Sequence, residues 1–162
     1  MFSTTVEYAL RAAVYLGTKY GEALTTEEVA IRTQVPAAYL AKILQGLTRH
    51  GLVRSQRGVG GGVTLGRPPQ QMTLLDIIAA VEPFKRIPVC PIGHHEPGEP
   101  LCPLHDAIDK VAAAVEASFA GITLASLMQD GAKRVEPLCK CPSHLAETVV
   151  IRLPLKVAAK VV

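Results

Sequence analysis

Tryptophan is absent from this chain, and aromatic residues make up 4% of it against 49% for hydrophobic residues as a whole. A core therefore has to be built from Ala, Leu, Val and Ile, which is typical of a helical protein. Long apolar runs are lacking as well, since none approaches the roughly 18 residues that cross a bilayer. The N-terminal stretch has an acidic residue, Glu7, where a secretory signal has positive charge, and Arg11 interrupts its apolar run. We therefore expect a cytoplasmic protein without a membrane partner.

Catalytic signatures are missing too. The glycines between Gly58 and Gly62 are not followed by the Gly-Lys-Ser/Thr that opens the helix of a phosphate-binding loop. No Ser/His/Asp set and no pair of carboxylates in a pocket stands out. We therefore expect that the protein is not an enzyme. Cysteine is scarce, with four residues, and in a reducing compartment these indicate metal or redox chemistry before structural disulfides.

The net charge of +3 is unevenly distributed. Residues 1–70 hold eight Lys/Arg against four Asp/Glu, residues 71–131 hold three against eight, and residues 132–162 hold six against two. A protein that coats nucleic acid with its whole surface would be basic throughout. This pattern instead favours a single basic face, carried by the N-terminal block.

Helical spacing of apolar residues predicts two helices at the start of the chain. The first covers residues 4–19, with Thr4 or Thr5 as its N-cap. The second begins after a Thr cap at Leu24-Thr25-Thr26, has Glu27 and Glu28 in its first turn, and runs to about Thr33.

A third helix is predicted from Ala37 to His50, with Pro36 suited to its first turn and Gly51 as its stop. Its inward stripe consists of Leu40, Ile43, Leu44 and Leu47. The residues available to face outward include Ala38, Tyr39, Lys42, Gln45 and Arg49. Two helices joined by a tight turn, the second outwardly polar and basic, describe a helix-turn-helix.

Two short runs with strand character, Leu52–Gln56 and Val63–Leu65, follow this helix. They flank four glycines that permit positive φ and a tight turn, namely Gly58, Gly60, Gly61 and Gly62. The sequence therefore predicts a β-hairpin with arginines near its tip. Helix, glycine stop and basic hairpin together indicate a recognition helix and a wing, so the expected fold is mainly α with a small β-hairpin wing.

The second half of the chain predicts fewer elements. Thr73 caps a short helix, Leu74–Val81, and a proline-rich loop follows. In the long helix at residues 104–120, apolar side chains recur every three or four positions, which suits a dimer seam, although an ordinary packing helix is the alternative. A short helix starts at Thr123. The expected organisation is a winged helix-turn-helix at 1–82, a Cys/His-containing sensor loop at 83–103, a dimerisation helix and short terminal helix at 104–130, and a tail at 131–162.

Several segments carry a family resemblance. The stretches YALRAAVYL, TTEEVA, VPAAYLAKILQGLTRHGLV, RGVGGGVTLG and MTLLDIIAAVEP occur in this order. With them the chain resembles the Rrf2 family of bacterial winged-helix transcription regulators over about residues 1–130. The family includes iron–sulfur regulators and a nitric-oxide sensor. The resemblance implies a homodimer joined through the long helix at 104–120, binding palindromic double-stranded operator DNA.

The resemblance also implies roles for the basic face. The helix containing Ala38, Tyr39 and Lys42, with Gln45 among its outward residues, would enter the major groove. Arg57, next to Gly58 on the wing, would reach the minor groove. Arg49 and Arg54 look better placed for phosphates, although a solvated surface charge is the alternative for any single arginine. A winged-helix module that binds protein instead of DNA is the alternative for the whole face.

A sensor site is implied in the loop before the long helix. Cluster-bearing members have three cysteines there, followed in some by a histidine three positions after the last. Cys90 and Cys102 keep the spacing of the first and third cysteines, and His105 lies at the histidine position. The middle cysteine is missing, and Glu96 stands there, preceded by His94 and His95.

Certain members complete the ligand set with an acidic residue of the partner's first helix, at a position that matches Glu7. A 2Fe-2S cluster held by Cys90, Cys102, His105 and Glu7 of the partner subunit would bridge the dimer. Three alternatives remain: a zinc site that uses two of the three histidines, a reversible thiol pair that acts as a redox sensor, and inert cysteines. A second group, Cys139, Cys141 and His144 in the tail, is weaker, and incidental cysteines are the favoured interpretation.

Overall fold

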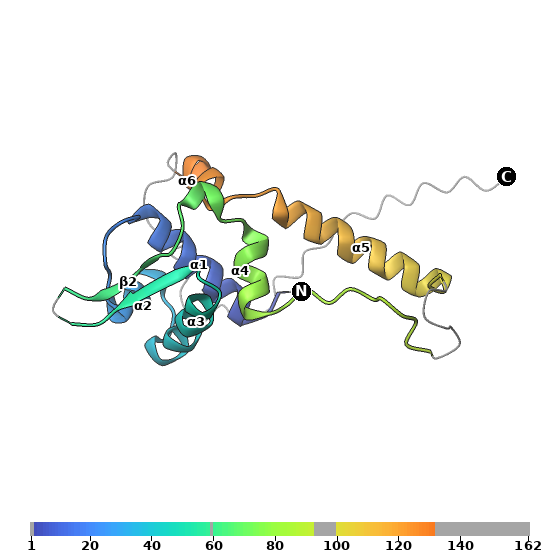
Figure 1. Ribbon diagram of the computed structural model, residues 1–162, viewed down its shortest axis with the longest axis horizontal. Coiled ribbons are helices and arrows are strands. Elements are labelled where there is room, and N and C mark those ends of the chain that lie inside the picture. The colour runs from blue at the N-terminus through green and yellow to red at the C-terminus, as the bar shows by residue number, and fades with distance from the viewer. Residues whose placement is uncertain (1, 59, 93–99, 132–162) are drawn as a thin grey trace.

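Helices and one two-stranded hairpin make up the computed structural model, which describes residues 2–58, 60–92 and 100–131 (Figure 1). The expected fold class, mainly α with a small β-hairpin wing, is confirmed. The elements are α1 (Thr4–Thr18), α2 (Thr26–Thr33), α3 (Ala37–Arg49), β1 (Val53–Gln56), β2 (Gly62–Leu65), a short 3-10 helix η1 (Pro69–Gln71), α4 (Leu74–Val81), α5 (Pro103–Ala120) and α6 (Leu124–Gly131). No helix in the described part of the chain is both long and apolar enough to span a membrane.

The N-cap of α1 differs from the prediction. Ser3, not Thr4 or Thr5, has the extended backbone of a cap, and its hydroxyl accepts a hydrogen bond from the N–H of Val6 at 3.3 Å. The two threonines already have helical backbone, so they cannot cap. The predicted cap of α2 is confirmed, because Thr25 accepts a hydrogen bond from the N–H of Glu28 at 3.1 Å.

The helix-turn-helix forms as its sequence predicts. Gln34 ends α2 with a left-handed backbone, φ 56°, and α3 starts three residues later. The buried residues of α3 are the four of the predicted inward stripe, Leu40, Ile43, Leu44 and Leu47. Gly51 follows α3 with φ +70°, as expected for a glycine stop.

The hairpin pairs Val53 with Leu65 and Gln56 with Gly62 in an antiparallel register. Gly58 and Gly60 have positive φ, at 109° and 76°. The prediction of positive φ is wrong for Gly61 and Gly62. At these two positions a side chain is excluded because neighbouring backbone atoms lie too close. A Cβ on Gly62 would lie 2.5 Å from the carbonyl oxygen of Leu24, because Leu24 and Val63 exchange two backbone hydrogen bonds that fasten the hairpin to the segment before α2.

Replacing Gly62 with alanine is therefore expected to lower the free energy of unfolding by about 1–3 kcal/mol, the usual cost of overpacking. The added methyl group has to push against backbone and not against a flexible side chain. Chemical denaturation measures the effect. Gly46→Ala in α3 is the matched control, because its Cβ would lie an ordinary 3.7 Å from the nearest atom. A G62A protein as stable as the wild type would contradict this account of the hairpin.

The core lies between α1, α3, α4 and the hairpin. Its α1 face combines the large Leu16 with three small side chains, Ala9, Ala12 and Ala13, and at these three the neighbouring helices can approach α1 closely. The predicted cap of α4 is confirmed as a capping box, in which Thr73 and Asp76 each accept a hydrogen bond from the other's N–H. Leu124 of α6 is fully buried and brings the end of the described chain back onto this core.

The long helix α5 stands apart from this core. It extends away from the other helices (Figure 1), and none of its residues is buried. The stretch between α4 and α5 runs beside it, and its described residues form no helix or strand. Phe119, near the C-terminal end of α5, packs edge-on against Phe2 at a centroid distance of 5.3 Å. The N-terminal end of α5 is thereby held far from the helix-turn-helix.

Candidate functional site

The predicted recognition surface is open to solvent. All five predicted residues of α3 are exposed, namely Ala38, Tyr39, Lys42, Gln45 and Arg49. Between α3 and the hairpin lies a shallow groove of about 370 Å³, and Gln45, Arg49 and Ser55 are among the residues that line it. Helix α3 and the wing therefore border one concave surface.

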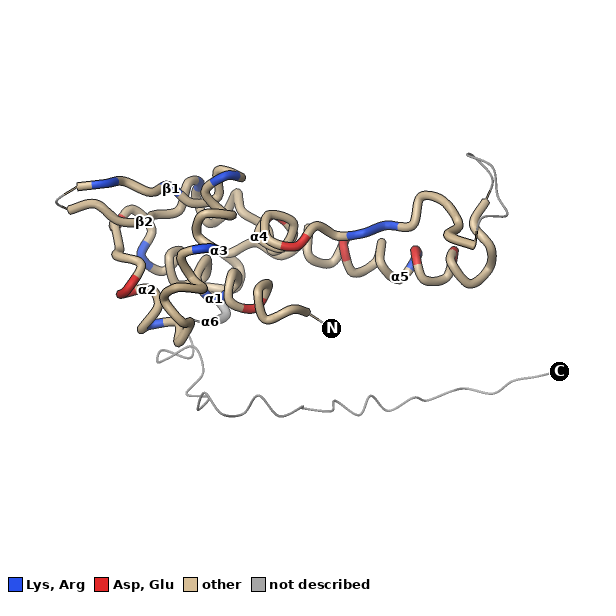
Figure 2. The backbone as a smooth tube through the Cα atoms, turned by 90° about the horizontal axis from the view of Figure 1, so that it is seen from below, with Lys and Arg blue, Asp and Glu red and all other residues tan. Residues whose placement is uncertain are grey.

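Basic residues dominate this part of the chain. Residues 29–75 contain six Lys/Arg and no Asp/Glu, and Figure 2 shows no acidic position on the hairpin or on α3. Arg54, Arg57 and Gly58 on the wing are exposed. A surface with this charge attracts a phosphate backbone.

Tyr39 is held in place by α1, which the sequence alone did not suggest. Its hydroxyl lies 2.5 Å from the hydroxyl of Thr5, and its ring packs edge-on against Tyr8 at a centroid distance of 5.7 Å. The guanidinium of Arg11 lies over the Tyr8 ring at 5.8 Å and pairs with Glu7. These α1 residues fix the side chain that begins the outward face of α3. The i, i+3 and i, i+4 spacing of Tyr8, Arg11 and Glu7 predicts the contacts within α1, but no local pattern predicts that Tyr8 meets Tyr39.

Cys90, Cys102 and His105 come together at the N-terminal end of α5. The Nδ1 atom of His105 lies 3.1 Å from the Sγ of Cys102 and 3.4 Å from the Sγ of Cys90, and the three donor atoms all lie within 4.8 Å of one another. Both cysteines are free, and Cys90 is 4% exposed. The structure thus joins three of the residues predicted as ligands.

The surroundings of Cys90 favour its thiolate form, which is the form that binds metals. The pKa of Cys90 is lowered, mainly by a hydrogen bond from the backbone of Ile92 and further by Cys102, against the opposing effect of desolvation. Cys102 is the N-cap residue of α5.

The donor set fits a metal centre. With bonds of about 2.3 Å to sulfur and about 2.0 Å to nitrogen, two ligands of one tetrahedral zinc ion lie about 3.5 Å apart, close to the 3.1 and 3.4 Å found here. A two-iron cluster divides four ligands between two irons, so a fourth donor would have to join these three. Soft thiolates and imidazole suit zinc and iron–sulfur centres alike.

Of the other predicted ligands, the structure describes Glu7 alone. Glu7 is on α1, where it forms an ion pair with Arg11, and it is not part of the three-residue group of its own chain. His94, His95 and Glu96 lie outside the described residues, as do Cys139, Cys141 and His144. These residues remain predictions.

An ion-pair cluster that the sequence did not reveal lies next to the Cys/His group. Arg86 forms a two-pronged contact with Asp109 of α5, and its Nη1 lies 3.3 Å from Glu116. The hydrogen bonds from Arg86 to Asp109, with one from the N–H of Ile87, lower the pKa of Asp109 to about 2. The ordinary pKa of an aspartate is near 4. The contact is therefore fully present above about pH 4 and is lost as the pH falls toward 2.

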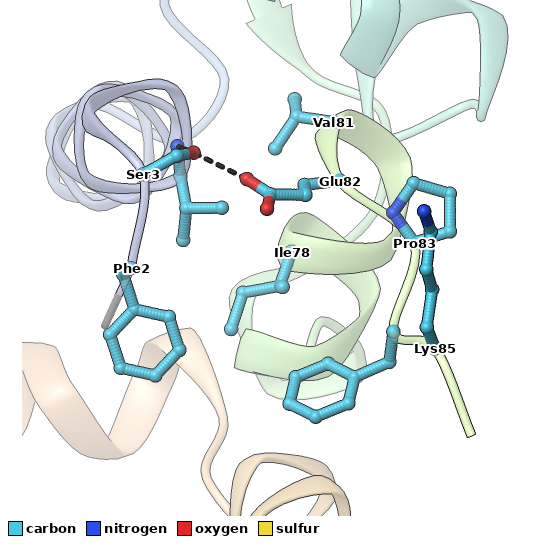
Figure 3. A pocket seen from close by; sticks show the side chains of 9 residues that line it. Phe2, Ser3, Ile78, Val81, Glu82, Pro83 and Lys85 are labelled. Carbon is cyan, nitrogen blue, oxygen red and sulfur yellow. Dashed lines mark hydrogen bonds between the residues drawn. The ribbon is translucent and has the colours of Figure 1, made fainter. Parts of the chain in front are cut away.

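A hollow of about 520 Å³ lies where α5 meets the core (Figure 3). Its walls come from the N-terminal end of α1 and the C-terminal end of α4, and the hydroxyl of Ser3 donates a hydrogen bond to Glu82 across it. Phe2 and Phe84, which also line it, both pack on Phe119. The hollow marks the junction between α5 and the recognition half of the chain.

Known proteins share this architecture. Residues 2–130 match the family Rrf2, described as an iron-dependent transcriptional regulator. A relative from Aquifex aeolicus, which carries the name of an HTH-type transcriptional regulator, is 29% identical over 143 residues, covering 86% of this chain and 99% of the relative.

Two solved structures are similar over most of the chain. The IscR of T. potens is 25% identical with a TM-score of 0.70, and the match covers 86% of this chain and 93% of that one. CymR, the global cysteine regulator of B. subtilis, is 27% identical with a TM-score of 0.67, covering 80% of this chain and 97% of that one.

Proposed function

Because the chain belongs to the Rrf2 family of transcriptional regulators, it is a DNA-binding protein, and we propose that it is a homodimer whose operator affinity is controlled by a metal centre at Cys90, Cys102 and His105. The observation that carries this proposal is the convergence of these three donors at the free end of α5. We propose the predicted division of the chain as its functional organisation, with residues 1–82 as the DNA-binding unit, residues 83–103 as the sensor loop and residues 104–130 as the dimerisation unit.

The dimer is supported by α5. Leu104, Ile108 and Val111 are 61%, 47% and 65% exposed, and their spacing places them on one face of the helix. An exposed apolar stripe of this kind is buried when a second copy packs against it. A two-fold axis uses the same face of both subunits, and the two copies of α5 would then form the seam of the dimer.

DNA docking is supported by the exposed α3 face and the basic wing. Helix α3 would lie in the major groove with Tyr39 and Lys42 toward the bases, and Arg57 would reach the adjacent minor groove. Arg49 lines the groove between α3 and the hairpin, Arg54 is exposed on the wing, and both would contact phosphates. Thr5 and Tyr8 would act through Tyr39, whose side chain they hold.

Salt dependence tests this docking. If each subunit neutralises about three phosphates, the slope of log K against log salt is expected to be about −5 for the dimer. Arg54→Ala removes one contact per subunit and should reduce the slope by about 2. Fluorescence anisotropy with a labelled duplex measures both slopes. Lys110→Ala is the control, because Lys110 is on α5 and pairs with Asp106; an equal change in this variant would contradict the assignment of the wing.

Iron is the metal that we propose. The description of the family as iron-dependent supports it, and a 2Fe-2S cluster would use Cys90, Cys102 and His105 with Glu7 of the partner subunit as the fourth ligand. When the two copies of α5 pack antiparallel, the N-terminal end of each lies near the C-terminal end of the other. That end adjoins α1 through the contact between Phe2 and Phe119, so Glu7 of the partner subunit would approach the Cys/His group.

Helix α1 offers a route from this centre to the DNA. Glu7 pairs with Arg11, Arg11 lies over Tyr8, and Tyr8 packs on Tyr39. Engagement of Glu7 by a cluster would release Arg11 from its ion pair and change the support of Tyr39. Loss of the centre would reverse this change. A change at the metal centre would in this way alter the position of Tyr39 on the recognition helix.

A zinc site is the second candidate, favoured by donor separations that match one tetrahedral ion. Anaerobic purification followed by visible absorption and quantitation of iron, sulfide and zinc separates the two. Brown protein with matched iron and sulfide supports the cluster, whereas colourless protein with stoichiometric zinc supports the tetrahedral site. Protein without either would contradict control by a metal and leave the thiol pair as the sensor.

A further inference from the structure

The stretch after α4 runs antiparallel to α5 along one face of the helix (Figure 1). The ring of Phe84 packs on Phe119 at a centroid distance of 6.4 Å. Two residues later, Arg86 reaches Glu116 and Asp109. Finally, Cys90 lies beside His105. Successive residues of the stretch thus contact positions on α5 that are progressively nearer its N-terminal end. The stretch therefore runs along α5 and places Cys90 at the end of the helix that carries the other two donors.

The firmest polar attachment of this stretch is the contact between Arg86 and Asp109. Nε and Nη2 of Arg86 donate to the two carboxylate oxygens of Asp109 at 2.7 and 2.5 Å, which is the two-pronged geometry that guanidinium and carboxylate prefer. The N–H of Ile87 donates to the same carboxylate at 2.9 Å. One aspartate therefore fixes a side chain and the backbone of the stretch together. We call Arg86, Ile87 and Asp109 the clamp.

The clamp is placed where it can position a ligand. Asp109 is one turn after His105 on α5, so the two side chains share a face of the helix. Ile87 precedes Cys90 by three residues, and the described residues between α4 and α5 form neither helix nor strand that could hold the thiol by itself. The apolar stripe of Leu104, Ile108 and Val111 lies on an adjacent face and stays free for a partner.

We propose that Arg86 and Asp109 are positioning residues for the Cys/His centre, because they hold the stretch against α5 and so set the distance of Cys90 from Cys102 and His105. This inference rests on the proposed function, since it concerns the same metal centre. The clamp does not touch the donor atoms. It keeps three donors in one place before the metal arrives, so that binding does not first have to order the loop.

The test uses the full chain, reduced and free of metal, with Co²⁺ alone as the probe. Thiolate-to-cobalt absorption reports whether both cysteines bind, and its titration gives the affinity. Arg86→Gln is expected to weaken Co²⁺ binding by about 10-fold or more, the usual effect of removing a residue that orients a ligand. Asp109→Asn should weaken Co²⁺ binding by a similar factor. The double variant should bind Co²⁺ only slightly more weakly than either single variant, because both substitutions remove the same contact between Arg86 and Asp109. Arg86→Lys should recover part of the affinity.

Lys110→Gln is the matched control. It removes a lysine of α5 that pairs with Asp106 at 2.6 Å, and it leaves the clamp intact, so its affinity should equal that of the wild type. A second measurement works without metal. Cys90 is buried, so Arg86→Gln should make it react several-fold faster with iodoacetamide, as followed by mass spectrometry, while Lys110→Gln should not.

The two measurements separate the clamp from the metal site. Equal labelling rates and equal Co²⁺ affinities in the wild type and R86Q would overturn the clamp and leave the metal site standing. Faster labelling of R86Q, with no Co²⁺ binding by any form, would uphold the clamp and overturn the metal site. In the metal-free state, the circular dichroism and the DNA affinity of R86Q should equal those of the metal-free wild type, because the clamp lies outside the core and the recognition surface.

Discussion

Replacing Cys90 with alanine is expected to remove metal from the protein, with a loss of affinity greater than about 100-fold. This exceeds the 10- to 100-fold typical of residues behind the ligands. Cys90 supplies one of three donors that lie within 4.8 Å of one another. Cys102 and His105 cannot hold an ion alone, since structural sites need about four ligands. Alanine is small and apolar, so it fits the buried position without introducing a polar group.

Metal analysis of anaerobically purified protein measures this effect, together with visible absorption if the metal is iron. Cys139→Ala is the matched control, because Cys139 belongs to the tail group that we interpret as incidental. It should retain the full metal content. A C90A protein that holds as much metal as the wild type would contradict the assignment of the centre. A loss of metal in C139A would show that the tail contributes to metal binding.

Replacing Ile108 with aspartate is expected to convert the dimer to a monomer and to weaken operator binding by more than about 100-fold. Ile108 is 47% exposed in one chain and lies between Leu104 and Val111 in the apolar stripe of α5. At a two-fold seam, aspartate would face its own copy or apolar side chains, and a buried unpaired charge is costly. A monomer also loses the gain from binding two half-sites at once.

Sedimentation velocity measures the dimer, and fluorescence anisotropy measures the DNA. Ala117→Asp is the matched control, since it adds the same charge to the same helix. Position 117 is two and a half turns from position 108 and therefore on the opposite face, and Ala117 is exposed. It should leave the dimer intact. Dimeric I108D, or equal dissociation of both variants, would contradict a seam along this stripe.

Much of the recognition half could be predicted because local sequence determines it. The spacing of Leu40, Ile43, Leu44 and Leu47 set the buried face of α3, and the glycine cluster placed the hairpin. Local sequence patterns do not predict a residue's role when that role depends on contact with a segment far away in the sequence. Gly62 is a glycine because the backbone of Leu24 approaches it, and no rule about turn residues contains that information.

The candidate centre shows the same division. Cys90, Cys102 and His105 could be chosen from their spacing and from the family resemblance, and the structure brings them together. The residues that support the Cys/His centre and the recognition helix could not be predicted from the sequence. Arg86 meets Asp109 across 23 residues, and Tyr39 meets Thr5 across 34. Such contacts arise from how α5 and α1 lie against their neighbours, and single charged or polar residues on exposed positions give no pattern that predicts them.

Control of DNA binding by the Cys/His centre is tested most directly by comparing one duplex with two states of the same protein. A duplex is first selected from a random library by the anaerobically purified protein. It is then titrated separately with the metal-loaded protein, with protein stripped of metal by a chelator, and with C90A. The expected result is a difference in affinity of at least about 10-fold, or 1.4 kcal/mol, between the loaded and stripped forms, with C90A behaving as stripped protein whatever metal is added. Equal affinities of all three forms for the duplex would show that the centre does not govern DNA binding.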